Sequence, residues 1–426
     1  MSHWQVLNPW RNRDETIIVT NSSNQFPRES GWRPLRIAVV GGRGVPSSYS
    51  GVERICEDLF AWFAARGHKV TIYCRSQVLT EKRGEYRGMR LVRTPAPGGK
   101  NGETLSHSLS SLIHAVLRGD ENGEPFDLVS LHTIAPNLFA PLPYLAGLRI
   151  ISHVHGLDHQ REKWKGIGAR VIRAAERMMV RCADKVVVVN PSLTDYYRDS
   201  FGIPTELLPN GIHAIDDQFE PDVSVMEKFG LTSKRYIVSV GRLVPEKRIQ
   251  DTIAAFKKIN TDFKLVFVGE GKHSPEYEQM VKSLAAADPH GRVVFTGQQS
   301  GHALETLFRS AGLYVSASEL EGMPSSVLEC MERQITPILS DIPPHRALFG
   351  GIADYDLTFA PGDVQALTEK LTWAINHLDE CQQLGGRARE FVRREYAWPV
   401  LAARTEQLYL RVAGEYEAAE ALVPTT

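Results

Sequence analysis

The 426-residue sequence contains no apolar run that approaches the roughly 18 residues needed by a membrane-spanning helix. Its longest apolar stretches, LFAPLPYLAGL and VVVVN, are short and interrupted by proline or polar residues. The first 33 residues also lack an apolar segment after a basic start, and Asp14 and Glu15 argue against a transit peptide. We therefore expect a cytoplasmic protein with a loose polar leader over residues 1–33.

Cysteine is scarce, with five residues scattered along the chain and no C-x-x-C pair. This distribution predicts buried thiols in a reducing compartment, and it excludes a disulfide framework or a zinc ribbon. No cluster of histidine, cysteine and carboxylate residues has metal-ligand spacing. We expect neither a metal nor a cofactor.

Length and charge indicate more than one domain. A chain of 426 residues exceeds the size of one ordinary core, and its 42% hydrophobic and 23% charged residues are typical of globular proteins. The net charge of -1 hides an asymmetry. Residues 34–212 carry 23 Lys+Arg against 17 Asp+Glu, whereas residues 213–397 carry 20 against 26. A basic and an acidic half predict two domains with different electrostatic roles.

The first half opens as a βαβ unit. LRIAVV (35–40) is a predicted strand that leads into the loop GGRGVPSSYSG, a helix over about 52–66 and the strand HKVTIYC (68–74). This order is typical of a parallel sheet, whose ligand crevice lies at the carboxyl ends of the strands. From residue 235 a second series of strands and helices alternates. The chain is therefore predicted to form two doubly wound α/β domains, joined near 212–230.

Further elements are predicted at these positions: strands at 127–132, 149–155, 185–190 and, ending the first run, LLPNGI (207–212), then helices over about 162–182, 302–311, 325–333 and 400–417.

The glycine-rich loop resembles a dinucleotide site only superficially. Ser47 stands where G-x-G-x-x-G needs a third glycine or alanine, and Arg75 replaces the acidic residue expected after the second strand. A bare turn is one interpretation. Glycines at the mouth of a parallel sheet, however, let a ligand approach the backbone. We expect a substrate loop, and an NAD-dependent oxidoreductase is disfavoured.

In the second half, VSVGRLVPEK places Arg242 and Lys247 just beyond a predicted strand. Two cations at such a crevice suit a diphosphate, because arginine offers a planar fork and lysine a point charge. The plainer interpretation is that they are solvated or paired with Glu246. For the two cations taken alone, the plainer interpretation is favoured.

Two carboxylates eight positions apart flank a turn in ELEGMPSSVLEC (319–330). The backbone N–H groups from Gly322 to Ser325 are predicted at a helix N-terminus, which attracts phosphate. Glu329, one turn inside the helix, can accept from the vicinal hydroxyls of a ribose, and Glu321 from a sugar hydroxyl. For either carboxylate alone, stabilisation of the helix dipole is an equally good explanation.

Taken together, these motifs resemble the retaining glycosyltransferases of the GT-B fold, a large family with an E-x7-E donor motif. The first half is similar to the branch that includes bacterial polysaccharide and rhamnosyl transferases. The resemblance covers roughly residues 35–412. The motifs that carry it are Gly241-Arg242 with Lys247, FVGEG (267–271), VVFTG (293–297), SELEGMPSSVLECM (318–331), RG-x-P (43–46), Y-x-G-x-E (49–53), HGLDHQREKW (155–164) and LLPNGI (207–212).

The resemblance implies two Rossmann-like domains that face each other across a cleft, with a C-terminal helix crossing back. Residues 34–212 with 398–426 would form the acceptor-side domain, and 213–397 the donor-binding domain. The implied reaction is metal-independent transfer of a sugar, with retention, from a nucleotide-diphosphate sugar to an acceptor hydroxyl in bacterial cell-surface polysaccharide or glycolipid assembly. A nucleotide-sugar epimerase of the same fold and a non-catalytic sugar-nucleotide-binding protein are the alternatives.

The family also implies roles for individual residues. Arg242 and Lys247 would bind the donor diphosphate, Glu329 the ribose, and Glu321 the transferred sugar. The remaining donor-binding candidates are Gly51, Asn210, Gly241, Glu270, Gly322, Met323 and Ser325.

A histidine from the first domain is implied near the sugar. His155 occupies that position, and His153 shares its strand parity, so which of the two faces the donor stays open. A strand histidine alone is more often structural. Cys330 replaces the alanine that often follows the second glutamate, which changes packing and leaves the chemistry alone.

A basic helix is predicted within residues 161–185, where eight basic residues stand against three acidic ones. Two interpretations are open: a solvated charged face, or a surface that rests on anionic lipid and faces a lipid-linked acceptor. No nucleic-acid partner is expected. The spacing places Arg170, Arg173, Arg177 and Arg181 on one face, and Ile172, Ala175, Met179 and Cys182 on another.

Overall fold

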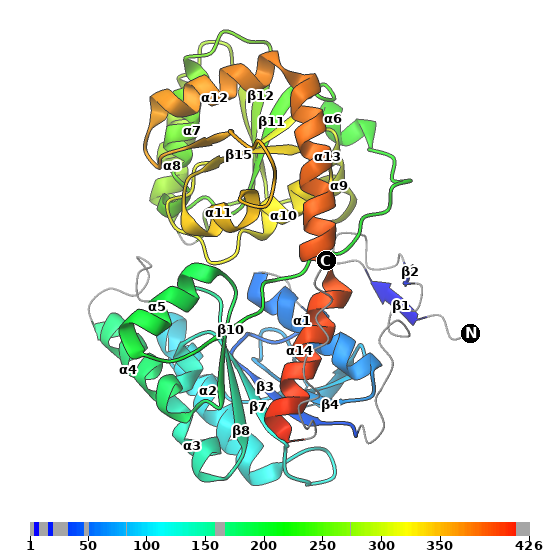
Figure 1. Cartoon of the computed structure of the whole chain (residues 1–426), viewed down its shortest axis with the longest axis vertical. Helices are drawn as coiled ribbons and strands as arrows, with labels where there is room; N and C mark the ends of the chain where they lie inside the picture. Colours follow the sequence, from blue (N-terminus) through cyan, green and yellow to red (C-terminus); the bar gives the residue numbers. More distant parts are fainter. Residues whose placement is uncertain are drawn as a thin grey trace. The chain divides into compact units, whose positions relative to one another are not determined.

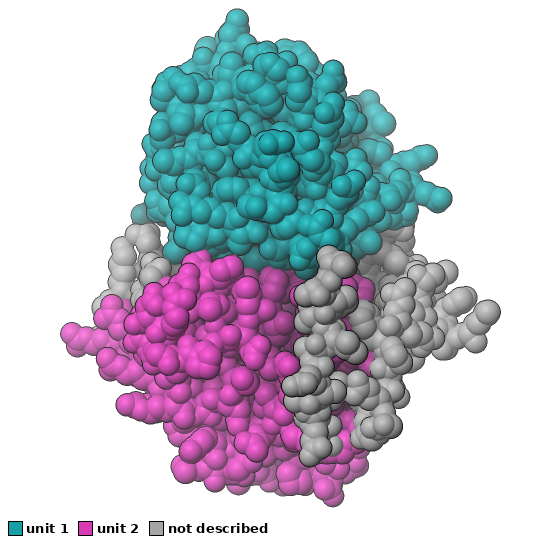
Figure 2. Space-filling model, in the orientation of Figure 1, with its two compact units in different colours: residues 1–21, 212–397 teal, residues 22–211, 398–426 magenta. Residues whose placement is uncertain are grey.

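The computed structural model describes residues 4–7, 16–19, 33–46, 51–81, 83–157, 167–272 and 274–414 (Figure 1). The described residues form two compact α/β units (Figure 2). Of the described residues, unit 1 contains 4–7, 16–19 and 212–397, and unit 2 contains those from 33 to 211 and from 398 to 414. Within the leader, β1 (Trp4–Leu7) and β2 (Thr16–Val19) pair antiparallel, and the leader's other residues up to 32 lie outside the described residues.

Unit 1 contains a parallel sheet of six strands: β11 (Tyr236–Val240), β12 (Lys264–Val268), β13 (Val293–Gly297), β14 (Leu313–Ser316), β15 (Thr336–Ser340) and β16 (Thr358–Phe359). Their order across the sheet is β13-β12-β11-β14-β15-β16. The direction of winding therefore reverses between β11 and β14. In open α/β sheets, ligands bind beyond the carboxyl ends of the strands at this switch point.

Helices cover both faces of this sheet. On one face, Ile237, Leu265 and Val315 share a core with Ile253 and Leu371. Strands that are buried on both sides appear in the sequence as continuous apolar runs, which is why they were predictable. The helices are α6 (Val223–Lys228), the 3-10 turn η5 (Pro245–Lys247), α7 (Ile249–Lys257), α8 (Pro275–Ala286), α9 (Gly301–Arg309), α10 (Ser325–Glu332), α11 (Pro343–Phe349), α12 (Val364–Asn376) and α13 (Leu378–Glu395).

Unit 2 contains an eight-stranded sheet in the order β10-β9-β8-β7-β3-β4-β6-β5. All neighbouring strands are parallel except β5 and β6, which form an antiparallel edge. The switch point of this sheet lies between β3 and β7. The strands are β3 (Arg36–Val40), β4 (Lys69–Cys74), β5 (Arg83–Tyr86), β6 (Met89–Arg93), β7 (Leu128–His132), β8 (Arg149–Val154), β9 (Lys185–Val188) and β10 (Glu206–Leu207).

Alternate residues of these strands enter two cores. Ile37 and Val39 pack with α1 (Gly51–Ala65) and α14 (Trp398–Ala413), whereas Ala38 and Ile150 pack with α2 (Gly99–Arg118). The two doubly wound units confirm the predicted fold class. The other helices are η2 (Ala135–Phe139), α3 (Pro141–Leu145), α4 (Ile167–Cys182) and α5 (Pro191–Phe201).

The last helix, α14, belongs to unit 2 although the chain reaches it through unit 1. A buried carboxylate anchors it: Glu406 accepts from Arg66 Nε at 2.7 Å and from His68 Nε2 at 2.9 Å. The Leu35 N–H donates to His68 Nδ1 at 3.0 Å, so the neutral ring carries its proton on Nε2, toward Glu406. Burial alone would raise the pKa of Glu406, but hydrogen bonds from His68 and Arg66 hold it below its usual value.

Candidate functional site

The predicted residues of unit 1 gather at its switch point. Gly241 directly follows β11, and Glu321 lies in the loop after the neighbouring strand β14. The two loops are tied together because the Glu319 N–H donates to the Glu246 carbonyl at 2.9 Å. A Cβ at Gly241 would stand 3.7 Å from the Lys247 ammonium nitrogen, an ordinary contact distance. Gly241 therefore lies directly beside the head of the lysine.

Lys247 and Glu321 form an ion pair, with side chains 21% and 11% exposed. Burial alone would raise the pKa of Glu321. The positive charge of Lys247 is the main opposing effect; with a contribution from His345 and hydrogen bonds from Lys247 and Ser318, it lowers the pKa of Glu321. The structure therefore corrects the plainer sequence interpretation, in which Glu246 was the carboxylate partner of Lys247.

Glu329 lies in α10 and is only 8% exposed. The buried Tyr314 of β14 is sensitive to both carboxylates of the motif. Its pKa is raised mainly by burial; a hydrogen bond with Ser326 opposes the shift, and the charges of Glu321 and Glu329 add to it. The charges of both glutamates therefore act on the same buried phenol.

The turn before α10 offers fewer free donors than predicted. Pro324 has no N–H, and the Ser325 N–H donates to the Met323 carbonyl at 2.9 Å. Two of the four positions from Gly322 to Ser325 therefore cannot present an N–H to a phosphate in this conformation. That expectation was wrong for these two positions, because the chain tightens into a proline turn there.

Two further candidates flank the ion pair. Arg242 is exposed, and no residue in the described part of the chain pairs with its guanidinium. Glu270 follows β12, and its carbonyl accepts from the Leu243 N–H at 3.1 Å. The Glu270 carboxylate is engaged by Lys272 at 3.1 Å and by the Gln298 N–H at 3.4 Å. Arg242 is thus available to a ligand, whereas Glu270 is held by its neighbours.

Sequence reasoning missed His345, which is fully buried beside this group. Its Nδ1 donates to the Ser340 carbonyl at 2.8 Å, which leaves Nε2 as an acceptor that no described residue satisfies. Burial lowers its pKa, and the nearby Glu321 charge opposes that shift. The sequence feature that could have pointed to His345 was its place in PPH (343–345), shortly after the buried strand β15.

In unit 2, the glycine-rich loop also lies at the switch point. Gly41 has φ 134°, and a Cβ there would fall 1.9 Å from the His132 carbonyl oxygen. The glutamate of the Y-x-G-x-E motif, Glu53, accepts from the Arg43 N–H at 3.1 Å and so shapes the loop. Gly51 begins α1 and is exposed, with open space around its Cβ position. Residues 47–50 of the motif lie outside the described residues.

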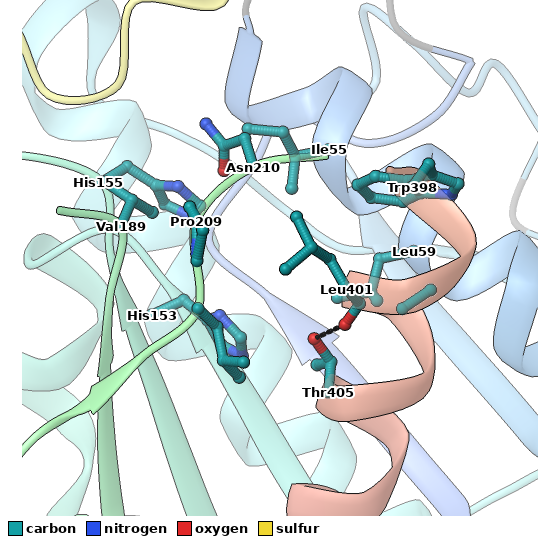
Figure 3. Close-up of a pocket in the computed structure, with 12 residues that line it drawn as sticks. Ile55, Leu59, His153, His155, Val189, Pro209, Asn210, Trp398, Leu401 and Thr405 are labelled. Atoms are coloured by element: carbon teal, nitrogen blue, oxygen red, sulfur yellow. Dashed lines mark hydrogen bonds between the residues drawn. The ribbon is translucent and has the colours of Figure 1, made fainter. Parts of the chain in front are cut away.

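A pocket in unit 2 brings His155 and Asn210 together (Figure 3). Asn210 is 7% exposed, and no described residue hydrogen-bonds to its side-chain amide. The rings of His153 and His155 stack at 6.3 Å, as their shared parity predicted, and both line this pocket. The other lining residues are Ile55, Leu59, Val189, Leu208, Pro209, Trp398, Leu401, Ala402 and Thr405.

Within the described residues, no group of three or more His, Cys, Asp or Glu side chains is arranged to hold a metal ion. One D-x-D triplet, which sequence reasoning overlooked, occurs at residues 354–356. Its Asp356 is 92% exposed and pairs with Lys370 at 3.0 Å. No helix in the described ranges is long and apolar enough to cross a membrane.

Two doubly wound units in tandem, with polar residues at each switch point and a last helix that returns to the first-half unit, are the architecture of the GT-B fold. Residues 225–391 match the family model of glycosyl transferases group 1, and residues 49–214 match that of glycosyltransferase family 4. Each half of the chain therefore matches a family model of glycosyltransferases. These matches favour neither the epimerase nor the oxidoreductase alternative.

Individual relatives agree with the class. The chain is 25% identical over 334 residues to alpha-maltose-1-phosphate synthase of Mycolicibacterium smegmatis, covering 71% of this chain and 84% of that protein. It is 26% identical over 404 residues to a GDP-mannose-dependent phosphatidylinositol monomannoside mannosyltransferase of the same species, covering 88% and 98%. The structure of Anabaena HepE in complex with UDP and glucose has a similar fold, with TM-score 0.72, 15% identity and coverage of 88% and 100%.

Proposed function

We propose that this protein is a retaining glycosyltransferase that moves a sugar from a nucleotide-diphosphate sugar to an acceptor hydroxyl in bacterial cell-surface glycan assembly. The observation that carries the proposal is the Lys247–Glu321 ion pair at the switch point of unit 1, between the loops that follow β11 and β14, with Glu329 in the helix α10 that comes next. A cation beside acidic side chains suits a ligand that is anionic at one end and rich in hydroxyls at the other.

The cations are assigned to the diphosphate. Arg242 is exposed and free of any described partner, so it can form a two-pronged contact with phosphate oxygens. Lys247 is already fixed by Glu321, so its ammonium needs little ordering when the donor binds. The sugar–phosphate bond breaks during transfer, and negative charge grows on the departing diphosphate. These two cations stabilise that charge.

Retention follows from a front-face path. The acceptor oxygen forms its bond to the anomeric carbon on the face from which the diphosphate leaves, and the acceptor proton passes to a diphosphate oxygen. The carboxylates then hold hydroxyls and need not act as an acid–base pair, so the closely spaced carboxyls of a glycosidase are not required. His155 is assigned to the transferred sugar.

The test is the anomeric configuration of the product. Proton NMR of the glycoside, recorded early in a reaction containing excess EDTA, is expected to show the configuration of the donor sugar. An inverted product would remove the front-face path, and loss of transfer on adding EDTA would remove metal independence.

Glu329→Gln is expected to raise the KM for the donor about tenfold while the protein stays folded. The neutral amide accepts more weakly from the two ribose hydroxyls, and hydrogen bonds to a charged group contribute about 1.5–3 kcal/mol. The measurement is steady-state kinetics with varied donor. Glu332→Gln is unsuitable as a control, because that buried carboxylate accepts a hydrogen bond from Arg393. The matched control is Glu380→Gln, an exposed glutamate of α13. An unchanged KM would rule out the ribose assignment.

The acceptor is assigned to a lipid-linked glycan at an anionic membrane surface. The four arginines of α4 are all exposed, and Ile172, Ala175 and Met179 of the opposite face are fully buried, so the predicted amphipathic pattern is confirmed. Leu145 of α3 and Leu117 of α2 are 82% and 74% exposed, on helices that contact each other, and α3 also contacts α4. Exposed cations and exposed leucines on neighbouring helices suit a bilayer surface.

Changing Arg170, Arg173, Arg177 and Arg181 to glutamine is expected to abolish co-sedimentation with vesicles of acidic lipid. Each cation contributes about 1 kcal/mol near such a surface, so four account for most of a reversible attachment. Wild-type binding is expected to weaken with salt. A control variant removes four exposed cations from unit 1: Lys228→Gln, Lys258→Gln, Lys282→Gln and Arg394→Gln. Equal sedimentation of wild type and the α4 variant would rule out membrane binding through these arginines and show that they form a solvated face of α4.

A further inference from the structure

A continuous chain of hydrogen bonds runs through the core of unit 2 and ends at His155. His155 Nε2 lies 3.2 Å from His132 Nδ1, and His132 Nε2 lies 3.0 Å from the Ser130 hydroxyl. The Ser130 hydroxyl lies 2.6 Å from the Tyr409 hydroxyl, which lies 2.9 Å from His153 Nε2. Four links therefore join the two histidines that line the pocket.

The register of the sheet creates this chain. His132 at the end of β7 pairs directly with His153 on β8, and their rings stack at 4.5 Å with an interplanar angle of 7°. Phe60 of α1 packs edge-on against His132 at 5.5 Å. Ser130, His132 and Tyr409 are fully buried. The interior members of the chain thus exchange no hydrogen bonds with solvent, and their protons are shared only among themselves.

The interior histidines are neutral. Burial lowers the pKa of His132 well below its ordinary value, and the neighbouring His153 and His155 lower it further. Burial, followed by the charge of His155, lowers the pKa of His153 to about 3. A neutral imidazole carries one proton, so one ring nitrogen donates while the other accepts.

A neutral His132 makes the links interdependent. If its Nδ1 donates to His155, its Nε2 must accept from Ser130, which then accepts from Tyr409, which accepts from His153. If the first link is reversed, every other link reverses with it. When His155 carries a single ring proton, each direction places that proton on a different nitrogen: on Nδ1 in the first case and on Nε2 in the second.

We propose that His132 and Tyr409 are positioning residues that hold His155 in one tautomer and one ring orientation for its action on the sugar. The catalytic part of this inference rests on the proposed function of His155. These hydrogen bonds also link His155 to the last helix, because Tyr409 lies in α14 whereas Ser130 and His132 lie in β7. Docking of α14 thereby sets the protonation pattern at the pocket.

The test variant is Tyr409→Phe, which removes one oxygen and breaks two of the four links. Its matched control is Tyr197→Phe, a fully buried tyrosine of the same unit whose hydroxyl donates to Glu176 at 2.8 Å. Two readouts are taken on the full chain: the ¹⁵N chemical shifts of the His155 ring nitrogens, and kcat and KM for the donor.

We expect wild type and Tyr197→Phe to show one His155 tautomer, and Tyr409→Phe to show a mixture. We also expect kcat of Tyr409→Phe to fall about tenfold with little change in KM, since misplacing a catalytic histidine's proton slows the chemical step. Unchanged ¹⁵N shifts would overturn the inference, as would altered shifts with a kcat equal to that of Tyr197→Phe. If wild type transfers no sugar, the proposed function fails while the shifts still decide whether the chain sets the tautomer.

Discussion

Lys247→Ala is expected to lower kcat for glycosyl transfer by about two to three orders of magnitude, the usual cost of removing one preorganised group that stabilises developing charge. The change should appear mainly in kcat, because the charge on the diphosphate grows toward the transition state. The variant also deprives Glu321 of its ion-pair partner, so the pKa of that carboxyl should rise. Arg242→Ala is expected to act in the same direction.

The matched control is Lys282→Ala, an exposed lysine of α8 that pairs with Glu278 at 2.7 Å. Exposed pairs contribute little, so its kcat and stability should equal those of wild type. Circular dichroism of Lys247→Ala confirms that the fold is kept. Wild-type turnover in the folded Lys247→Ala protein would leave Lys247 as a structural partner of Glu321 and remove it from the chemistry.

Glu406→Gln is expected to destabilise unit 2 by about 3–5 kcal/mol, because it leaves the buried Arg66 guanidinium without an ionised partner. Their side chains are 4% and 7% exposed. For a domain of this size, that loss corresponds to a fall in Tm of roughly 6–20 °C, measured by calorimetry of the full chain.

A second consequence concerns pH. The pKa of Glu406 is lower in the folded protein than in the unfolded chain. The contribution of Glu406 to the free energy of unfolding is therefore complete above its pKa in the unfolded chain, near 4.5. That contribution is lost as the pH falls through its pKa in the folded protein. Glu406→Gln should remove that part of the acid sensitivity. Arg404→Ala, an exposed change on the same helix, is the control. Equal Tm values for the two variants would show that α14 does not depend on this anchor.

The parallel strands could be predicted from the sequence because they are buried on both faces. YIVSV and KLVFV consist almost entirely of apolar residues, and each lies in the structure within two residues of its predicted place. The same regularity placed Gly241, Arg242 and Glu321 at the carboxyl ends of strands. Which ends lie side by side depends on strand order, which the switch point between β11 and β14 supplies.

The segment between residues 75 and 126 was not predicted. It contains α2 and the β5–β6 edge, and α2 opens with GKNGETLSHSLSS, where glycine and serine mask the apolar stripe that begins at Leu109. Tertiary packing against β3 and η2 holds this helix, and a local sequence pattern does not report such contacts.

His132 and Tyr409 were beyond sequence reasoning for a different reason. Neither residue belongs to a motif, and the hydrogen bond between Ser130 and Tyr409 that links them joins positions 279 apart. Only the register that pairs His132 with His153, together with the return of α14 to unit 2, brings them together. A sequence motif selected His155, but no motif indicated the residues that form hydrogen bonds with it.

The central claim is that unit 1 binds a nucleoside diphosphate through the switch-point residues. The direct measurement is calorimetric titration of the full chain with UDP, GDP, dTDP and ADP, together with the same titrations of Glu329→Gln and Arg242→Ala. One of the four nucleotides should bind wild type and raise its Tm by mass action, and both variants should bind it about tenfold or more weakly. Absence of binding to all four, or equal binding to wild type and both variants, would contradict the account.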